Sequence, residues 1–351
     1  MAEPVYVGRE AIASALDVKT SAYMNREIDR ACASGSRATE GLCDRRFYPL
    51  AATKYWDWPN TQSAPPWRLW LDDNELISAS AVVSNGVTIP ADSYNLEPNE
   101  YGPPYDRLEL LRSGNYAFAG ASTPQRAIGI TGLYGFTNDE EQPALLAAVM
   151  SSSSATSLTL DSPAGDVGSL IRIGNERMFI TDKLWSASVQ TVQNASGMDA
   201  STNTTTLTVT DSTVYEADEV ILIDTERMKV REVVGSTTLI VTRAWDGTTL
   251  AIHANAAPIY RQLTLIVQRG VLGTTAATHA LNALVYRWVP PSLITEMAQA
   301  YAEDAFLQRN TGYARTVGSA DNERMASGRG IKDLEIRVRR TYARMGRQRS
   351  V

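Results

Sequence analysis

The chain has 351 residues, of which 44% are hydrophobic and 21% charged, and its formal net charge is −6. This length has room for two or three domains, and the composition is that of an ordinary soluble globular protein. No apolar run approaches the roughly 18 residues that a membrane-spanning helix requires, and no secretory segment follows Met1. We therefore expect a protein that is made and kept in the cytoplasm and has no membrane partner.

The charge is distributed unevenly. The segment from Ile331 to Val351 has seven basic and two acidic residues, which gives it a charge of +5. Because the whole chain has a net charge of −6, the remaining residues together carry −11. An acidic body thus carries a basic tail. The basic residues of this tail are Lys332, Arg337, Arg339, Arg340, Arg344, Arg347 and Arg349.

The first segment is expected to be helical, with Thr20 as the N-cap of a long helix that ends near Asp44. Its apolar and small residues recur at helical spacing and predict one buried face. That face comprises Met24, Ile28, Cys32, Gly35, Ala38 and Leu42. Cys32 and Cys43 would lie about 16 Å apart along this helix, too far for a disulfide, so both are expected to be buried reduced thiols.

Strands and turns are expected between Tyr55 and Phe136. The hairpin sequence AVVSNGVTI places Asn85-Gly86 at a two-residue turn. The strand candidates are LWLDD, AVVSNGVTI, SYNLEP, RLELL and AIGITGLYGF. The tryptophans of this region, in a proline-rich β context, favour a core or a subunit interface over a sugar or nucleobase platform. They are Trp56, Trp58, Trp67 and Trp70.

A repeat appears after Ala148, where the composition shifts to Thr, Ser and Val. The segment that starts at Ser157 matches the one that starts at Thr206, so that Glu176-Arg177-Met178 and Glu226-Arg227-Met228 fall 50 positions apart. The stretch RAWDGTTLAIHANAAPIYR matches RGVLGTTAATHALNALVYR only 26 positions further on. Two different offsets exclude a plain tandem array.

Nesting explains both offsets. An inner module, 205–261, would lie inside an outer module whose halves are 157–192 and 263–288, each a β unit of about four strands. The polar run 194–206 would be a loop between them. The residues that mark the two copies are His253, His279, Glu176, Arg177, Glu226 and Arg227.

His253 and His279 are the chain's two histidines. Because they occupy matching positions of the two copies, we favour a structural role, in which the imidazole nitrogens hydrogen-bond loop backbone and hold a connection between strands. A shared metal site is the alternative, but the repeat does not supply a third and a fourth ligand.

Helical period returns after Pro290-Pro291, where Ser292 can cap a helix that continues to Arg309. The stretch 311–333 is polar and reads as a linker. Leu334, Ile336 and Val338 then alternate with charged residues and predict a terminal strand that pairs with another subunit.

The fold class expected from these elements is α+β: a small helical core with a short β element, a large all-β insertion of two nested related modules, and an extended C-terminal tail. The insertion would leave near Phe136 and return at Pro290, and the helices of the two ends would pack together. The domains are 1–147 and 289–318 for the core, 148–288 for the insertion and 319–351 for the basic tail.

No catalytic motif is found: the chain lacks GxSxG, HExxH, Walker, GxGxxG, CxxC-pair and EF-hand patterns. The acidic clusters Asp72-Asp73-Glu75 and Asp139-Glu140-Glu141 could hold a cation or act as acid and base, but solvated turns are the better interpretation. We expect no enzyme, no cofactor and no metal.

The arrangement resembles the head-to-tail adaptor (connector) proteins of tailed bacteriophages. The matching stretches are the long helix that runs into GLCDRRFYP, then LWLDD, VSNGVTIPADSYNLEP, ITGLYGF and PPSLITEMAQAYAEDAFLQR, about half of the chain. The ERM and RGxxGTTxxxHA elements are similar to a β module of phage structural proteins, although an insertion of this size departs from the small members of the family.

The resemblance implies a homo-oligomeric ring, typically of twelve subunits, between the portal protein and a stopper or tail-completion protein, in the virion neck after assembly in the host cytoplasm. DNA would pass through the centre without sequence-specific binding, because an acidic wall repels phosphate. Portal contact in such proteins involves C-terminal segments. Here the corresponding residues are Leu334, Ile336, Arg337, Val338, Arg339 and Arg340. The alternative is a binding module whose β insert recognises carbohydrate or decorates the capsid.

Overall fold

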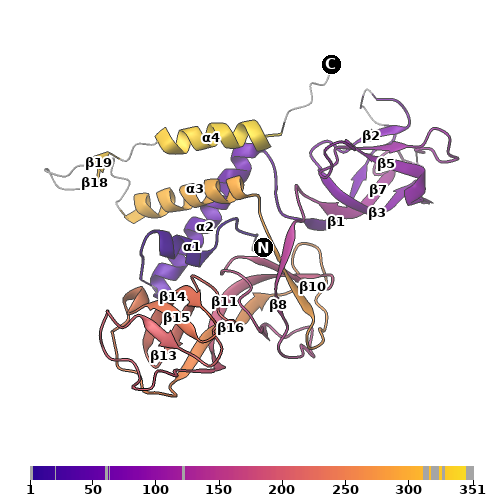
Figure 1. Ribbon diagram of the computed structural model, residues 1–351. Helices are drawn as coiled ribbons and strands as arrows, with labels where there is room; N and C mark the ends of the chain where they lie inside the picture. Colours follow the sequence, from indigo (N-terminus) through magenta and orange to yellow (C-terminus); the bar gives the residue numbers. More distant parts are fainter. Residues whose placement is uncertain are drawn as a thin grey trace.

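The structure is a computed structural model that describes residues 3–344, except positions 20, 60–61, 63, 121–122, 311–315, 318–323 and 326–328. The fold class is α+β. The two ends of the chain form the helices, and the residues between them in the sequence form antiparallel sheets (Figure 1). The α-helices of the described residues are α1 (Arg9–Ala15), α2 (Ala22–Cys43), α3 (Ser292–Asn310) and α4 (Arg329–Tyr342).

The long N-terminal helix forms where it was predicted. Its cap is Ser21, whose hydroxyl accepts a hydrogen bond from the Met24 amide at 3.2 Å. Thr20, the predicted cap, lies outside the described residues. The helix ends at Asp44, which adopts a left-handed backbone with φ of 50°.

α2 packs closely on α3 and so joins the two ends of the chain in one helical core. A Cβ atom on Gly35 would lie 2.5 Å from the Ala298 carbonyl oxygen and 2.8 Å from the Ala302 amide nitrogen, so only glycine permits this approach. Cys32 and Cys43 are buried free thiols, as predicted. Burial raises the pKa of the Cys32 thiol to about 12, which keeps it protonated.

The C-terminal segment is a helix, and the predicted terminal strand is wrong. α4 packs on α3 and α2 and buries Leu334 and Val338, which are 5% and 0% exposed, whereas Ile336 is 48% exposed. Apolar residues at every second position are typical of a strand. Leu334 and Val338 are also one helical turn apart, however, and the helical core buries these two side chains and not that of Ile336. The tail predicted to be extended over 319–351 therefore contains a helix; Arg347 and Arg349 lie outside the described residues.

The first β unit, between α2 and the insert, consists of a four-stranded sheet of order β1-β7-β3-β4 and a three-stranded sheet of order β2-β6-β5 around one core. Its strands are β1 (Leu50–Trp56), β2 (Arg68–Trp70), β3 (Leu76–Ser84), β4 (Val87–Ile89), β5 (Tyr94–Glu97), β6 (Arg107–Leu110) and β7 (Ile128–Tyr134). Asn85 and Gly86 form the predicted turn, with φ of 49° and 77°. Each segment predicted as a strand here contains one; most of β1 was missed.

The insert is a ten-stranded antiparallel sheet of order β12-β15-β14-β13-β16-β11-β10-β17-β8, with β9 paired to β16. Its strands are β8 (Glu140–Leu145), β9 (Ser157–Thr159), β10 (Leu170–Ile173), β11 (Glu176–Thr191), β12 (Thr206–Thr208), β13 (Val220–Ile223), β14 (Glu226–Val234), β15 (Thr238–Thr242), β16 (Pro258–Gln268) and β17 (Leu284–Trp288). β8 and β17 pair, so the chain enters and leaves the insert through neighbouring strands; the sheet thus begins before position 148.

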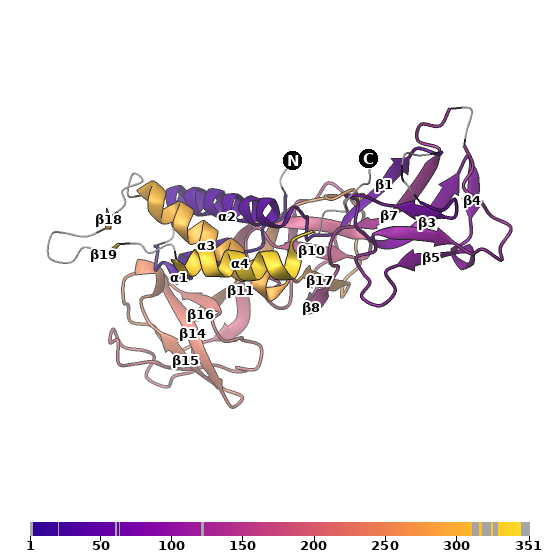
Figure 2. The same ribbon diagram turned by 90° about the horizontal axis from the view of Figure 1, so that it is seen from above.

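Two separate hydrophobic cores lie along this sheet. The outer β unit contains β8, β9, β10, β17 and the first half of β11, and its core includes Ile171 and Val285. The inner β unit contains β12 to β15, and its core includes Ile221 and Leu239. β11 and β16 pair along both units. In Figure 2 the helices form a layer beside the insert, and the first β unit projects beyond their end, away from the inner β unit.

Within the predicted linker, β18 (Thr316–Val317) pairs with β19 (Arg324–Met325). Most of the other linker positions lie outside the described residues.

Candidate functional site

The repeat-marking residues of the inner β unit form one buried cluster around Glu226, the first residue of β14. Its carboxylate accepts two hydrogen bonds from Arg243, both at 2.8 Å, and two more from the backbone amides of Ala244 and Ala251. His253 Nε2 lies 2.9 Å from the same carboxylate, and its Nδ1 lies 2.7 Å from Asp224. Glu226 and His253 are both fully buried.

The outer β unit repeats this cluster around Glu176. Arg269 donates two hydrogen bonds of 2.6 Å to the carboxylate, and the amides of Gly270 and Ala277 donate at 3.1 and 3.0 Å. His279 Nε2 lies 2.8 Å from it. One member differs: the position that matches Asp224 is Gly174, so the second imidazole has no equivalent carboxylate at Nδ1.

The histidines hold strand connections, but through carboxylates and not through the backbone carbonyls that the sequence interpretation expected. Their main chains contribute as well, because His253 bridges to Met198 and His279 to Met150. Each imidazole belongs to its own unit. Among the described residues, no group of three or more His, Cys, Asp or Glu side chains could hold a metal ion.

Arg177 and Arg227, the other repeat markers, have matching backbone contacts and different side-chain contacts. The backbone amide of Arg177 donates to the Thr274 hydroxyl and that of Arg227 to the Thr248 hydroxyl, each at 3.0 Å. The Arg177 guanidinium then binds Asn138, whereas that of Arg227 binds Asp246.

The six residues that the sequence assigned to a partner interface are divided by α4 between two faces. Leu334 and Val338 are buried in the helical core and are not available to a partner while α4 is docked. The other four are exposed: Ile336, Arg337, Arg339 and Arg340. Arg337 makes one long ion pair, 3.7 Å from Glu296, and both of those side chains are mostly exposed.

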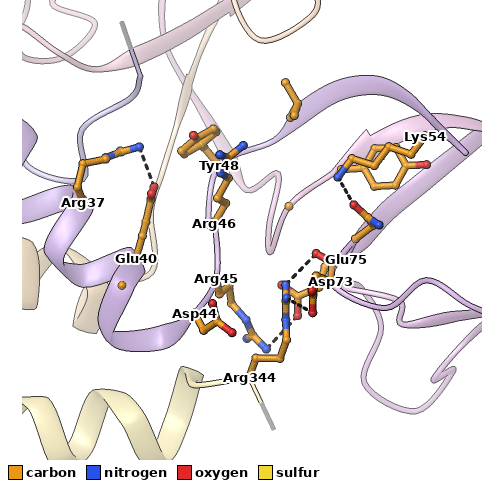
Figure 3. A pocket seen from close by; sticks show the side chains of 15 residues that line it. Arg37, Glu40, Asp44, Arg45, Arg46, Tyr48, Lys54, Asp73, Glu75 and Arg344 are labelled. Carbon is orange, nitrogen blue, oxygen red and sulfur yellow. Dashed lines mark hydrogen bonds and ion pairs between the residues drawn. The ribbon is translucent and has the colours of Figure 1, made fainter. Parts of the chain in front are cut away.

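A polar cavity of about 460 Å³, here called the arginine pocket, lies between the end of α2, the first β unit and the end of α4 (Figure 3). It brings together segments that are far apart in the chain: Arg46 follows α2, Lys54 is on β1, and Arg344 follows α4. Tyr48 and Tyr134 form part of its wall. The sequence interpretation missed this site, because nothing in the spacing of these residues relates them.

Ion pairs tie α4 to the first β unit at this pocket. Arg344 lies 3.0 Å from Asp73 and 3.5 Å from Glu75, and Arg45 lies 3.0 Å from Glu75 (Figure 3). The Arg344 amide also donates to the Cys43 carbonyl at 3.0 Å. The acidic cluster Asp72-Asp73-Glu75 therefore contributes to an interface within the chain.

A second cavity, of about 630 Å³, lies where α1 meets both units of the insert. Its lining includes Trp185 of β11 and Trp245, both half-buried. Asp166 also lines it, and burial raises the pKa of this carboxyl to about 6, with Glu10 adding to the effect.

The remaining sequence candidates have structural contacts. Glu140 pairs with Arg172, and Glu141 pairs with Arg287. Of the four clustered tryptophans, Trp56 is a buried member of the first β unit's core, and Trp58 and Trp67 pack against that core. Trp70 lies under the guanidinium of Arg107, 5.2 Å from the ring centre.

Comparison of this chain with protein-family models, with curated proteins and with solved structures finds no match in any of the three. Within the part of the chain that the structure describes, no helix is long and apolar enough to cross a membrane.

Proposed function

We propose that this protein is a structural component of a tailed-phage neck, a head-to-tail adaptor. It forms a homo-oligomeric ring with a central passage for DNA, binds the portal protein on one side and meets a stopper or tail-completion protein on the other. It is assembled in the host cytoplasm, becomes part of the virion and catalyses no reaction. The sequence resemblance is the source of this proposal.

One structural observation carries it further: α4 has two unlike faces. Leu334 and Val338 anchor the helix on the protein's own core, while Arg337, Arg339 and Arg340 remain exposed on a chain whose other residues are acidic in sum. A helix held in this way offers a preformed cationic surface, which favours recognition of an acidic partner. The proposed portal contact is therefore this exposed helix face, with Ile336 as its apolar contact, and not an added strand.

The proposal includes a duplicated insert, with the inner module nested inside the outer one. Equivalent partners around Glu176 and Glu226, equivalent bridges at His279 and His253, and a separate core for each unit support it. Such a module adds bulk to the adaptor, and the charged residues of its two buried clusters are paired within the module.

The test is binding to the portal of the same phage. The triple variant Arg337→Glu, Arg339→Glu, Arg340→Glu is expected to keep its fold and lose the complex in sedimentation velocity, since it reverses three exposed charges. A matched control reverses Arg26, Arg112 and Arg126, which are exposed on other elements, and is expected to bind. Electron microscopy of the wild-type complex should show a ring; a monomeric adaptor, or portal binding that survives the first triple variant, would refute the proposal.

A binding module that uses the β insert is the second candidate, and the cavity with Trp185 and Trp245 favours it. Aromatic faces beside polar groups are typical of ligand sites at the junction of structural units. Glycan binding by the full chain that is lost in Trp185→Ala and in Trp245→Ala, but kept in Trp67→Ala, would support this candidate over the adaptor.

A further inference from the structure

The arginine pocket contains two basic groups, Arg46 and Lys54, that make no ion pair with a carboxylate among the described residues. No ion pair or hydrogen bond of the Arg46 side chain occurs among the described residues, and this side chain is exposed at the pocket. Among the described residues, the Lys54 side chain donates to a neutral partner, the Asn74 amide oxygen at 2.7 Å, and its ammonium lies 4.4 Å from the centre of the Tyr134 ring.

The acidic groups around the pocket are largely occupied by other partners. Glu75 lies between Arg45 and Arg344. Glu40 accepts a hydrogen bond of 2.5 Å from the Tyr6 hydroxyl and pairs with Arg37 at 3.0 Å. Burial lowers the pKa of the Lys54 ammonium. The positive charges of Arg46 and Arg344 lower this pKa further.

Two further donors in the pocket lack an acceptor. The Nε atoms of Arg45 and Arg344 are buried, and neither has a hydrogen-bond partner among the described residues. A buried donor without an acceptor costs free energy, so the two arginines that hold Glu75 have hydrogen-bonding capacity that their ion pairs do not use. The pocket thus has unused positive charge and unused hydrogen-bonding capacity together.

We propose that the arginine pocket binds a carboxylate side chain of an acidic peptide segment in a partner protein, between Arg46 and Lys54. This site is separate from the exposed face of α4, so it goes beyond the proposed adaptor function. Leu50, which is half-buried at the pocket, offers apolar surface to the methylene groups of a glutamate. The volume of about 460 Å³ accommodates a side chain and part of its backbone.

The rim of the pocket favours a peptide over a nucleic acid. Asp73 has a side chain that is 88% exposed, and Asp44 is exposed as well. Nucleic acid would bring closely spaced phosphates against these carboxylates, which costs electrostatic free energy. A glutamate of a flexible peptide can enter between the basic groups while its neighbours turn away from the rim, which the fixed phosphate spacing of a duplex does not allow.

The test is calorimetric titration of the full chain with acetylated hexaglutamate at low ionic strength. Arg46→Glu and Lys54→Met are each expected to weaken binding at least about tenfold, as loss of a charge-assisted hydrogen bond does. Arg26→Glu changes the net charge as Arg46→Glu does, but on an exposed part of α2, and should leave the affinity within about twofold. The net charge of −6 opposes non-specific attraction of the peptide, and Arg26→Glu controls for the change in overall charge.

Three outcomes would overturn the proposal: no binding of hexaglutamate at millimolar concentration, equal weakening by Arg26→Glu, or tighter binding of inorganic phosphate or a DNA duplex than of the peptide. Because no ion pair or hydrogen bond of the Arg46 side chain occurs among the described residues, Arg46→Glu is expected to fold, and it remains informative if Lys54→Met proves unstable.

Discussion

At the residue scale, the inner and outer β units each depend on one buried carboxylate. Glu226 is 0% exposed and has an arginine, a histidine and two backbone amides around it. Buried charges of this kind are tolerated as a complete set, because every group is paired, and removal of one member leaves the others uncompensated. The charged residues that mark the repeat are explained by this requirement.

Replacement of Glu226 by Gln tests this dependence. The variant leaves the buried Arg243 guanidinium without its counter-charge, so the free energy of unfolding should fall by about 3 to 5 kcal/mol. Urea unfolding followed by circular dichroism measures it. Glu232→Gln, an exposed position of the same strand β14, should change it by less than about 0.5 kcal/mol. Similar values for the two variants would contradict the role of the cluster.

The same carboxylates predict a dependence of stability on pH. Burial by itself would raise their pKa values, but hydrogen bonds from the arginine, the backbone amides and the histidine outweigh it and lower the pKa of Glu176 and of Glu226 to about 2, below the ordinary 4.5. A group with a lowered folded-state pKa stabilises the protein above its unfolded-state pKa and loses that contribution as the pH falls. Stability should therefore decrease from about pH 4.5 to pH 2, and the double variant Glu176→Gln, Glu226→Gln should show a shallower decrease in acid titrations.

At the element scale, the packing of α2 on α3 depends on a residue without a side chain. Gly35→Ala should lower the free energy of unfolding, because its methyl group would meet the Ala298 carbonyl and force the helices apart. Gly41, on the same helix, has no atom within 4 Å of such a methyl group. Gly41→Ala should therefore stabilise the protein by up to about 1 kcal/mol through helix propensity. Thermal unfolding of the two variants provides the comparison, and a shift of the same sign for both would contradict this packing.

α4 shows how one segment can satisfy two patterns. Leu334, Ile336 and Val338 alternate like a strand, and Leu334 and Val338 also fit a helical stripe. α4 packs on the helical core through Leu334 and Val338, so two of the three apolar side chains are buried. Arg337, Arg339 and Arg340 are thereby placed on the exposed side of the helix.

At the scale of the whole molecule, the insert has two cores that share strands β11 and β16. If the inner β unit folds as a module of its own, it should be removable. In the register of these strands Ala187 faces Tyr260, so replacing residues 188–259 by Asn-Gly would close a two-residue hairpin. We expect the shortened chain to fold and to retain slow hydrogen exchange at Ile171 and Val285 of the outer β unit. Loss of that protection would mean that the two units fold as one.

Local periodicity and turn chemistry are enough to predict several features of this fold. These include the α2 and α3 helices, the strands β2 to β7 of the first β unit, the Asn85-Gly86 turn and the matching residues of the repeat. Each of them depends on residues within about one element of each other, so their spacing reveals them.

The long-range partners of these residues follow from the packing of the whole chain and are not predictable from local patterns. Glu226 meets His253 across 27 positions, and Asp73 meets Arg344 across 271, through packing that no local pattern encodes. The same holds for α4. Its sequence is compatible with a strand or a helix, and it is a helix because the neighbouring core buries Leu334 and Val338, which are one helical turn apart. The physical reason is that a pattern states which side chains share a face, whereas the fold determines what that face contacts.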